Sequence, residues 1–210
     1  MEEIRKKYEL KKDEFKKRLL EFREVLDQSE ERIFTELAFC LCTPQSKATQ
    51  CWKAVSSLAG NNLLFTGNES QIKPFLNVVR FGDTKAKHIV AARNLFSQNG
   101  KISLKDKLSS FNNSYEAREW LVENVMGFGM KEASHFLRNI GFATELAILD
   151  RHILKNLHAH KAIEEIPKTL TEKKYLEIEN KMKEFSQKIG IPLEELDLLF
   201  WSEETGMIFK

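Results

Sequence analysis

Lys131 and Asp150 are the two side chains of this sequence that are best suited to chemistry. Lys131 follows two closely spaced glycines and falls in the first turn of a predicted helix, whose positive end disfavours a charged amine. A free amine is a nucleophile. Asp150 comes about twenty residues later, at the predicted start of another helix, where a carboxylate caps backbone N–H groups and can still face a cleft. Lys131 therefore suits nucleophilic chemistry, and a catalytic role of Asp150 is compatible with its role as a cap. Each residue also fits an ordinary role, a surface lysine and a helix cap.

Gly127 and Gly129, with Phe128 between them, predict a tight turn between two helices. Glycine permits a positive φ and the close approach of another backbone. Met130 then begins the second helix, whose first N–H groups are free and carry the positive end of the helix dipole. Such a turn can hold a phosphate without contacting a base. It also fits a plain corner between two helices.

The elements that must position these residues are predicted to be helices. Apolar residues recur at helical spacing along the chain. Strands are not predicted, because no hairpin dipeptide joins two alternating β-branched runs. Ser46, Asp83 and Asp150 are predicted helix caps. The predicted helices cover residues 1–30, 31–42, 47–58, 68–79, 84–98, a short segment from 114, then 130–140, 150–157, 171–189 and 193–203.

Length and composition exclude several classes of protein. The chain has 210 residues, enough for one large domain or two small lobes with a sizeable core. Its 33 Lys and Arg nearly balance 31 Asp and Glu, which excludes a uniformly basic coat protein. No apolar run approaches the ~20 residues of a membrane span, and the charged N-terminus is not a signal or transit peptide. Three cysteines are too few for a four-thiolate iron–sulfur cluster and indicate free thiols in a reducing compartment.

One stretch of the chain is locally basic. Seven basic and two acidic residues lie between Arg80 and Lys107, and Lys85 is among the basic ones. This charge fits a surface that faces phosphates, with Lys85 as a candidate DNA contact. It fits equally well a solvated helix face that is basic without a partner.

The segment from Val125 to Leu154 resembles a known family. VMGFGMKEA, followed about twenty residues later by an aspartate, is similar to the helix-hairpin-helix superfamily of base-excision DNA glycosylases. Within it, GFGMKEASHFLRNIG followed by AILDRHIL resembles the second, archaeal-type family of 8-oxoguanine DNA glycosylase/AP lyases. The similarity extends through most of the chain and is weakest in the first thirty residues. Ile148 and Leu149 stand where the wider superfamily often has Gly-Pro, a form that matches this family.

This resemblance implies a reaction. The amine of Lys131 would displace the damaged base and form a Schiff base with the sugar, which permits β-elimination of the 3′ phosphate. Asp150 would help to deprotonate the lysine and balance positive charge at the sugar. The base must first leave the duplex. Gln45, in the loop Thr43-Pro44-Gln45-Ser46, would fill the gap it leaves, although a polar loop with a helix cap explains these residues too.

The resemblance also implies the residues that hold the base. Phe81 and Trp201 match positions that sandwich it, although core packing is an alternative for Phe81. Oxidation turns guanine N7 from an acceptor into a donor, so an acceptor there selects the lesion. The terminal Lys210 is implied in this recognition, through its carboxylate or a backbone carbonyl, and Asp197 is a further candidate.

The predicted molecule is all-α, with two helical lobes, a helix-hairpin-helix motif and an active-site cleft between the lobes. Residues 33–142 form the central lobe, and residues 1–32 with 143–210 form the other. Its partner is duplex DNA that contains 8-oxoguanine; no cofactor, metal site, membrane or protein partner is expected. We expect a cytoplasmic protein that associates with the nucleoid while it acts on DNA. Two alternatives remain: a glycosylase for another damaged base, and a non-catalytic DNA-binding module.

Overall fold

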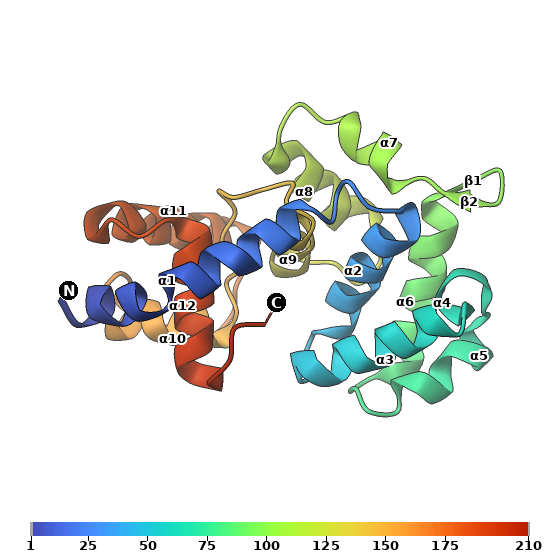
Figure 1. Cartoon of the computed structure of the whole chain (residues 1–210), viewed down its shortest axis with the longest axis horizontal. Coiled ribbons are helices and arrows are strands. Elements are labelled where there is room, and N and C mark those ends of the chain that lie inside the picture. The colour runs from blue at the N-terminus through green and yellow to red at the C-terminus, as the bar shows by residue number, and fades with distance from the viewer. Residues whose placement is uncertain (1, 210) are drawn as a thin grey trace.

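The computed structural model describes residues 2–209 and is almost entirely helical, which confirms the all-α prediction (Figure 1). A single pair of two-residue strands accompanies the helices within this part of the chain. The helices are α1 (Glu2–Arg23), α2 (Glu30–Cys42), α3 (Ala48–Gly60), α4 (Leu63–Thr66), α5 (Glu69–Ile72), a 3-10 turn (Lys73–Leu76), α6 (Gly82–Leu95), α7 (Leu104–Ser109), α8 (Ser114–Asn124), α9 (Met130–Asn139), α10 (Arg151–Ala159), α11 (Glu172–Ile189) and α12 (Leu193–Thr205).

Two hydrophobic clusters form the core. The first lies among α2, α3, α6, α8 and most of α9. The second joins α1, α10, α11 and α12. Helix α9 belongs to both, because Met130 packs in the second cluster whereas Phe136 and Leu137 pack in the first. Figure 1 shows α9 in the middle of the molecule, between α1 and α2. The helix that carries Lys131 is therefore held from both sides. The predicted boundaries at 32 and 142 stay a prediction.

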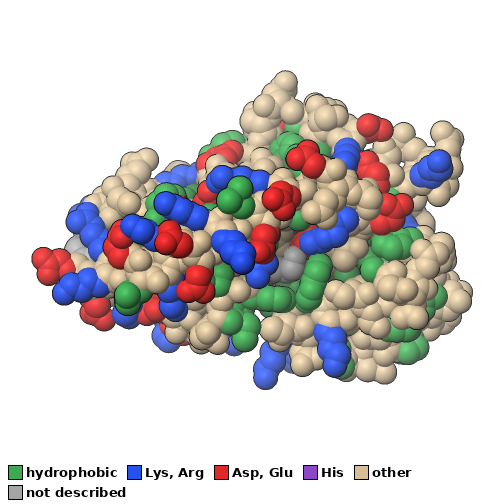
Figure 2. All heavy atoms as spheres, viewed as in Figure 1, with side chains coloured by type: hydrophobic (Ala, Val, Ile, Leu, Met, Phe, Trp, Pro, Cys, Tyr) green, Lys and Arg blue, Asp and Glu red, His purple; other side chains and the backbone are tan. Residues whose placement is uncertain are grey.

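The first thirty residues are not one helix. α1 ends at Arg23, and Ser29 begins α2 as its N-cap, with the hydroxyl accepting from the Arg32 N–H. Charged side chains of both signs alternate over α1 on the face shown in Figure 2. In the described part of the chain, no helix is long and apolar enough to cross a bilayer.

The region from 68 to 102 departs from the predictions. The helix expected over 68–79 breaks into α5 and a 3-10 turn, because Pro74 cannot continue the helical hydrogen bonds. Asn99 and Gly100 both have positive φ, so they form a hairpin turn. This turn joins β1 (Ser97–Gln98) to β2 (Lys101–Ile102), so the prediction of no strand was wrong here.

Two predicted helix caps are also wrong. Asp83 lies inside the first turn of α6 and pairs with Lys73 at 2.9 Å, while the N-cap is Phe81. The Ser46 hydroxyl does not cap α3, because it accepts from the Arg80 N–H and from Lys85 Nζ instead. Asp150 does cap α10, as predicted.

Candidate active site

The two glycines of the turn between α8 and α9 differ in backbone conformation. Gly127 has a φ of 92°, and a Cβ atom there would lie 2.2 Å from Nδ1 of His88. Only glycine fits, since both the backbone and the neighbouring imidazole exclude a side chain. Gly129 is instead extended, with a φ of −114°, so its glycine is not needed for a positive φ. Phe128 packs into the first cluster at 8% exposure. The turn is thus anchored on α6 and in the core.

Lys131 lies in the first turn of α9 and points inward. Its side chain is 22% exposed, and Nζ lies 2.9 Å from Oε1 of Glu132. The same amine donates to Thr43 Oγ1 at 3.2 Å. Oε2 of Glu132 accepts from the Gly129 N–H, which is the N-cap amide of α9, at 3.3 Å. The fold therefore holds the amine in one place, next to the loop that was predicted to penetrate the duplex.

That loop is held from within by Lys85. The Lys85 ammonium donates to the carbonyls of Cys42 and Pro44 at 2.6 and 2.9 Å and to the Ser46 hydroxyl. Burial lowers the pKa of Lys85. Because the side chain is only 4% exposed, its amine serves the loop rather than a phosphate. Gln45 stands at the exposed tip with a φ of 55°.

Asp150 caps α10 with one carboxylate oxygen. Oδ1 accepts from the N–H groups of His152 and Ile153 at 2.8 and 2.9 Å. Its neighbour Leu149 packs in the second cluster together with Met130, the residue before Lys131. Each of the two predicted catalytic residues thus follows a residue of the same cluster, and none of the hydrogen bonds or ion pairs of the described residues joins their side chains.

Asp197 lies inside the protein. It is 7% exposed, and Oδ2 lies 3.3 Å from Nη1 of Arg138 on α9. Burial raises the pKa of Asp197 to about 7, against the opposing charge of Arg138, and the charge of Asp150 adds to the rise. The charge of Asp150 therefore affects the protonation of Asp197, which lies on α12.

The two aromatic residues predicted to hold the base lie on different elements. Phe81 is 56% exposed at the start of α6, with Arg80 over its ring at 5.4 Å, so it does not pack in the core. Trp201 on α12 stacks on Phe209, at 6.4 Å between ring centroids. Phe209 in turn meets Phe39 of α2 edge-on at 6.3 Å. Lys210 lies outside the described residues.

Three residues of this region were not predicted. Thr43 contacts Lys131 from 88 residues away, a distance over which spacing gives no signal. No motif or spacing in the sequence indicates that Phe209 stacks on Trp201 either. Glu132 could have been found, since a glutamate three residues after the N-cap position is the mark of a capping box.

The chain is similar to known proteins over nearly its whole length. A family model described as 8-oxoguanine DNA glycosylase matches residues 15–191. An 8-oxoguanine DNA glycosylase/AP lyase of Fusobacterium nucleatum is 46% identical over 209 residues, which cover 99% of this chain and 96% of that protein. One of Methanocaldococcus jannaschii is 40% identical over 211 residues and covers 99% of each chain.

Solved structures show the same fold. The crystal structure of the M. jannaschii 8-oxoguanine glycosylase/lyase in complex with a 15mer DNA containing 8-oxoguanine has a TM-score of 0.88, at 38% identity and full coverage of both chains. The 8-oxoguanine DNA glycosylase of Thermotoga maritima has a TM-score of 0.84 at 31% identity, and covers all of this chain and 97% of its own.

Proposed function

The chain belongs to the 8-oxoguanine DNA glycosylase family, and we propose from this that Lys131 is its nucleophile and Asp150 the carboxylate that assists it. It is a bifunctional DNA glycosylase/AP lyase, which removes 8-oxoguanine from duplex DNA and then cleaves the strand. One observation carries the residue assignment. The Lys131 amine is held within reach of Thr43, in the loop that must enter the duplex where a base is turned out.

The reaction follows from an amine in this position. Nζ of Lys131 attacks C1′ of the extruded nucleoside, and the bond from C1′ to the base breaks as the base leaves with its electron pair and takes up a proton. Opening of the sugar ring gives a Schiff base between Nζ and C1′. Loss of a C2′ proton then breaks the bond from C3′ to the phosphate oxygen, which is the β-elimination.

We expect Asp150 to assist through its second oxygen. Oδ1 is engaged by two backbone N–H groups, so the carboxylate is fixed in direction and Oδ2 remains to accept a proton or face positive charge at the sugar. The Glu132 carboxylate pairs with the resting amine, which must lose its proton before it attacks.

The rest of the site supports the base and the DNA. Phe81 and Trp201 supply aromatic faces for a flat purine, and Gln45 stands where it can fill the gap in the duplex. Gly127, Phe128, Gly129 and Met130 place the first turn of α9 against a phosphate. Because its substrate is duplex DNA, we propose that the protein is cytoplasmic and associates with the nucleoid while it acts.

Borohydride trapping on a duplex with 8-oxoguanine tests the nucleophile. The wild type crosslinks to the DNA, and Lys131→Gln does not, because reduction can only fix a Schiff base. Lys181→Gln, the same change at a surface lysine of α11, leaves trapping unchanged. Trapping by Lys131→Gln at the wild-type level overturns the assignment of the nucleophile.

Asp150→Asn is expected to bind lesion DNA and to lower the rate of excision by about 10²–10⁴. Full activity of this variant removes Asp150 from the mechanism.

A panel of duplexes with oxidised pyrimidines, mismatches and undamaged guanine tests the substrate. Binding with a steep salt dependence and without cleavage of any of them indicates a non-catalytic module.

A further inference from the structure

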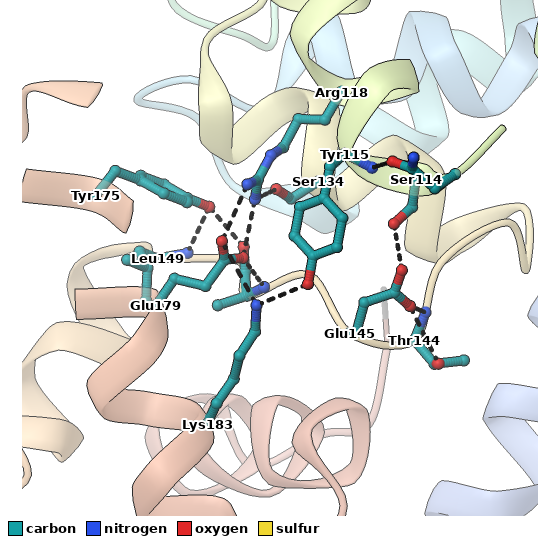
Figure 3. Close-up of polar contacts among 12 residues, drawn as sticks. Ser114, Tyr115, Arg118, Ser134, Thr144, Glu145, Leu149, Tyr175, Glu179 and Lys183 are labelled. Carbon is teal, nitrogen blue, oxygen red and sulfur yellow. Dashed lines mark hydrogen bonds and ion pairs between the residues drawn. The ribbon is translucent and has the colours of Figure 1, made fainter. Parts of the chain in front are cut away.

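A buried polar network lies where α8, α9 and α11 meet the segment that leads to Asp150 (Figure 3). Arg118 of α8 and Glu179 of α11 form a two-armed ion pair, with distances of 2.8 and 3.0 Å between their nitrogens and oxygens. Their side chains are each 2% exposed. Paired carboxylate and guanidinium groups of this geometry are rigid, because two parallel bonds fix both planes.

The network holds the backbone just before Asp150. Glu179 accepts from the Ala147 N–H at 2.7 Å. The Tyr175 hydroxyl donates to the Ala147 carbonyl at 2.5 Å and accepts from the Leu149 N–H at 3.2 Å. Burial raises the pKa of Tyr175, so its hydroxyl stays protonated and able to donate. An irregular segment without helical hydrogen bonds thus receives three from side chains of α11.

The same network reaches the helix of the nucleophile. Nη1 of Arg118 donates to the hydroxyl of Ser134, one turn after Lys131 on α9. In Figure 3, Arg118 and Ser134 meet Tyr175 and Glu179 around the Leu149 backbone. One buried cluster therefore contacts both the helix that carries Lys131 and the segment that carries Asp150.

We propose that Tyr175, together with the Arg118–Glu179 pair, is a positioning residue that fixes Asp150 relative to Lys131. This inference rests on the proposed function of those two residues. No side chain of the network needs to touch the DNA. Its effect on the rate comes from geometry, since a displacement of about 1 Å of a reacting group lowers a rate by up to about 100-fold.

Tyr175→Phe tests the proposal, because it keeps the ring and removes the two hydrogen bonds of the hydroxyl to Ala147 and Leu149. We expect kcat for 8-oxoguanine excision to fall by about 10-fold to 100-fold while KM stays within about twofold of the wild type. Tyr8→Phe is the matched control. Tyr8 is a buried tyrosine of the second cluster whose hydroxyl donates to Glu195 at 2.7 Å and makes no hydrogen bond to Ala147, Leu149 or Asp150. It is expected to lose similar stability and keep its kcat.

The double variant separates positioning from general weakening. In an Asp150→Asn background, Tyr175→Phe is expected to lower kcat no further, since the carboxylate it positions is already gone. A wild-type kcat in Tyr175→Phe, or the same fold-loss in both backgrounds, overturns the proposal.

Two further measurements distinguish failure of the positioning role from unfolding of the variant and from failure of the proposed function. If melting shows that Tyr175→Phe is unfolded, Glu179→Gln is measured in the same way, and a wild-type kcat there overturns the proposal. If the wild type forms no trapped complex, the proposed function itself fails. Trapping that depends on Lys131 and is indifferent to Tyr175 leaves the function intact and removes only the positioning role.

Discussion

The pair of Arg138 and Asp197 shows how individual residues link the site to the stability of the protein. Both side chains are buried, and Arg138 also lies over the ring of Phe22 at 4.7 Å. Burial lowers the pKa of Arg138 and raises that of Asp197 to about 7. A carboxyl group that binds its proton more tightly in the folded protein makes stability depend on pH.

Asp197→Asn is expected to change this dependence. The raised pKa of Asp197 gives the folded protein an advantage that is complete below the unfolded pKa of 3.8 and is lost as pH rises through about 7. The free energy of unfolding of the wild type, relative to Asp197→Asn, should fall by roughly 2–4 kcal/mol across this window and be level above it. Urea unfolding of both proteins at several pH values measures the difference. A difference that does not change with pH contradicts the pKa of Asp197.

Single residues with distinctive neighbours could be predicted from the sequence, and residues that act through distant contacts could not. Lys131 and Asp150 stand in a recognisable pattern of glycines and helix starts. Tyr175 belongs to a regular amphipathic helix and looks like any core tyrosine, and its partner Leu149 is 26 residues away. Lys85 was predicted to contact DNA because it lies in a basic stretch of the chain. Charge along the sequence does not reveal that this lysine is buried.

At the scale of elements, α6 supports both turns that are proposed to meet DNA. Lys85 holds the loop of residues 43–46, and His88, three residues further on, lies against Gly127. Residues three apart share one face of a helix, so a single surface of α6 sets the distance between loop and hairpin. Burial lowers the pKa of His88, and the neighbouring charge of Lys85 acts in the same direction.

Gly127→Ala is expected to disturb this contact. The added Cβ meets the His88 ring and adopts an unfavourable φ. Gly190→Ala is the control, because Gly190 also has a positive φ, of 68°, but has open space around it. Gly190→Ala should lower the free energy of unfolding by about 1–2 kcal/mol, and Gly127→Ala by a further ~1–3 kcal/mol. Chemical denaturation measures both; equal losses would show that His88 does not constrain the turn.

Helical periodicity predicted most of these elements, with ends that differ by a few residues. The errors lie where local chemistry competes with the pattern. Asn99 and Gly100 were interpreted as the end of a helix, although the same dipeptide closes a hairpin when two short strands can pair. Ser46 was interpreted as a helix cap from its place in the sequence, whereas its hydroxyl accepts from Lys85 of α6 and from the Arg80 N–H just before that helix.

At the scale of the whole molecule, the segment after α12 joins the two core clusters. It turns back toward the middle of the molecule (Figure 1). Ile208 packs against the second cluster and Phe209 against the first, where it meets Phe39. Phe209 also covers one face of Trp201. This segment therefore connects the parts of the protein that are proposed to enclose the base.

Phe209→Ala and Ile208→Ala are expected to differ in function. Each removes a half-buried apolar side chain and should lower the free energy of unfolding by about 1–2 kcal/mol. Only Phe209→Ala removes the contact with Trp201 and Phe39, so only this variant should raise KM for lesion DNA. Excision kinetics with both variants test this. Equal KM values for the two variants would mean that the contacts of Phe209 with Trp201 and Phe39 have no part in holding the base.

The three cysteines have a consequence for the conditions in which this enzyme works. Cys40, Cys42 and Cys51 are fully buried. Burial raises the pKa of Cys42 to about 12 and that of Cys51 to about 11. Peroxides attack thiolates at accessible sites, and the thiols of Cys42 and Cys51 are neither ionised nor accessible at neutral pH. We therefore expect the thiols of Cys42 and Cys51 to stay reduced in the folded protein when it is exposed to peroxide, one of the oxidants that damage DNA bases.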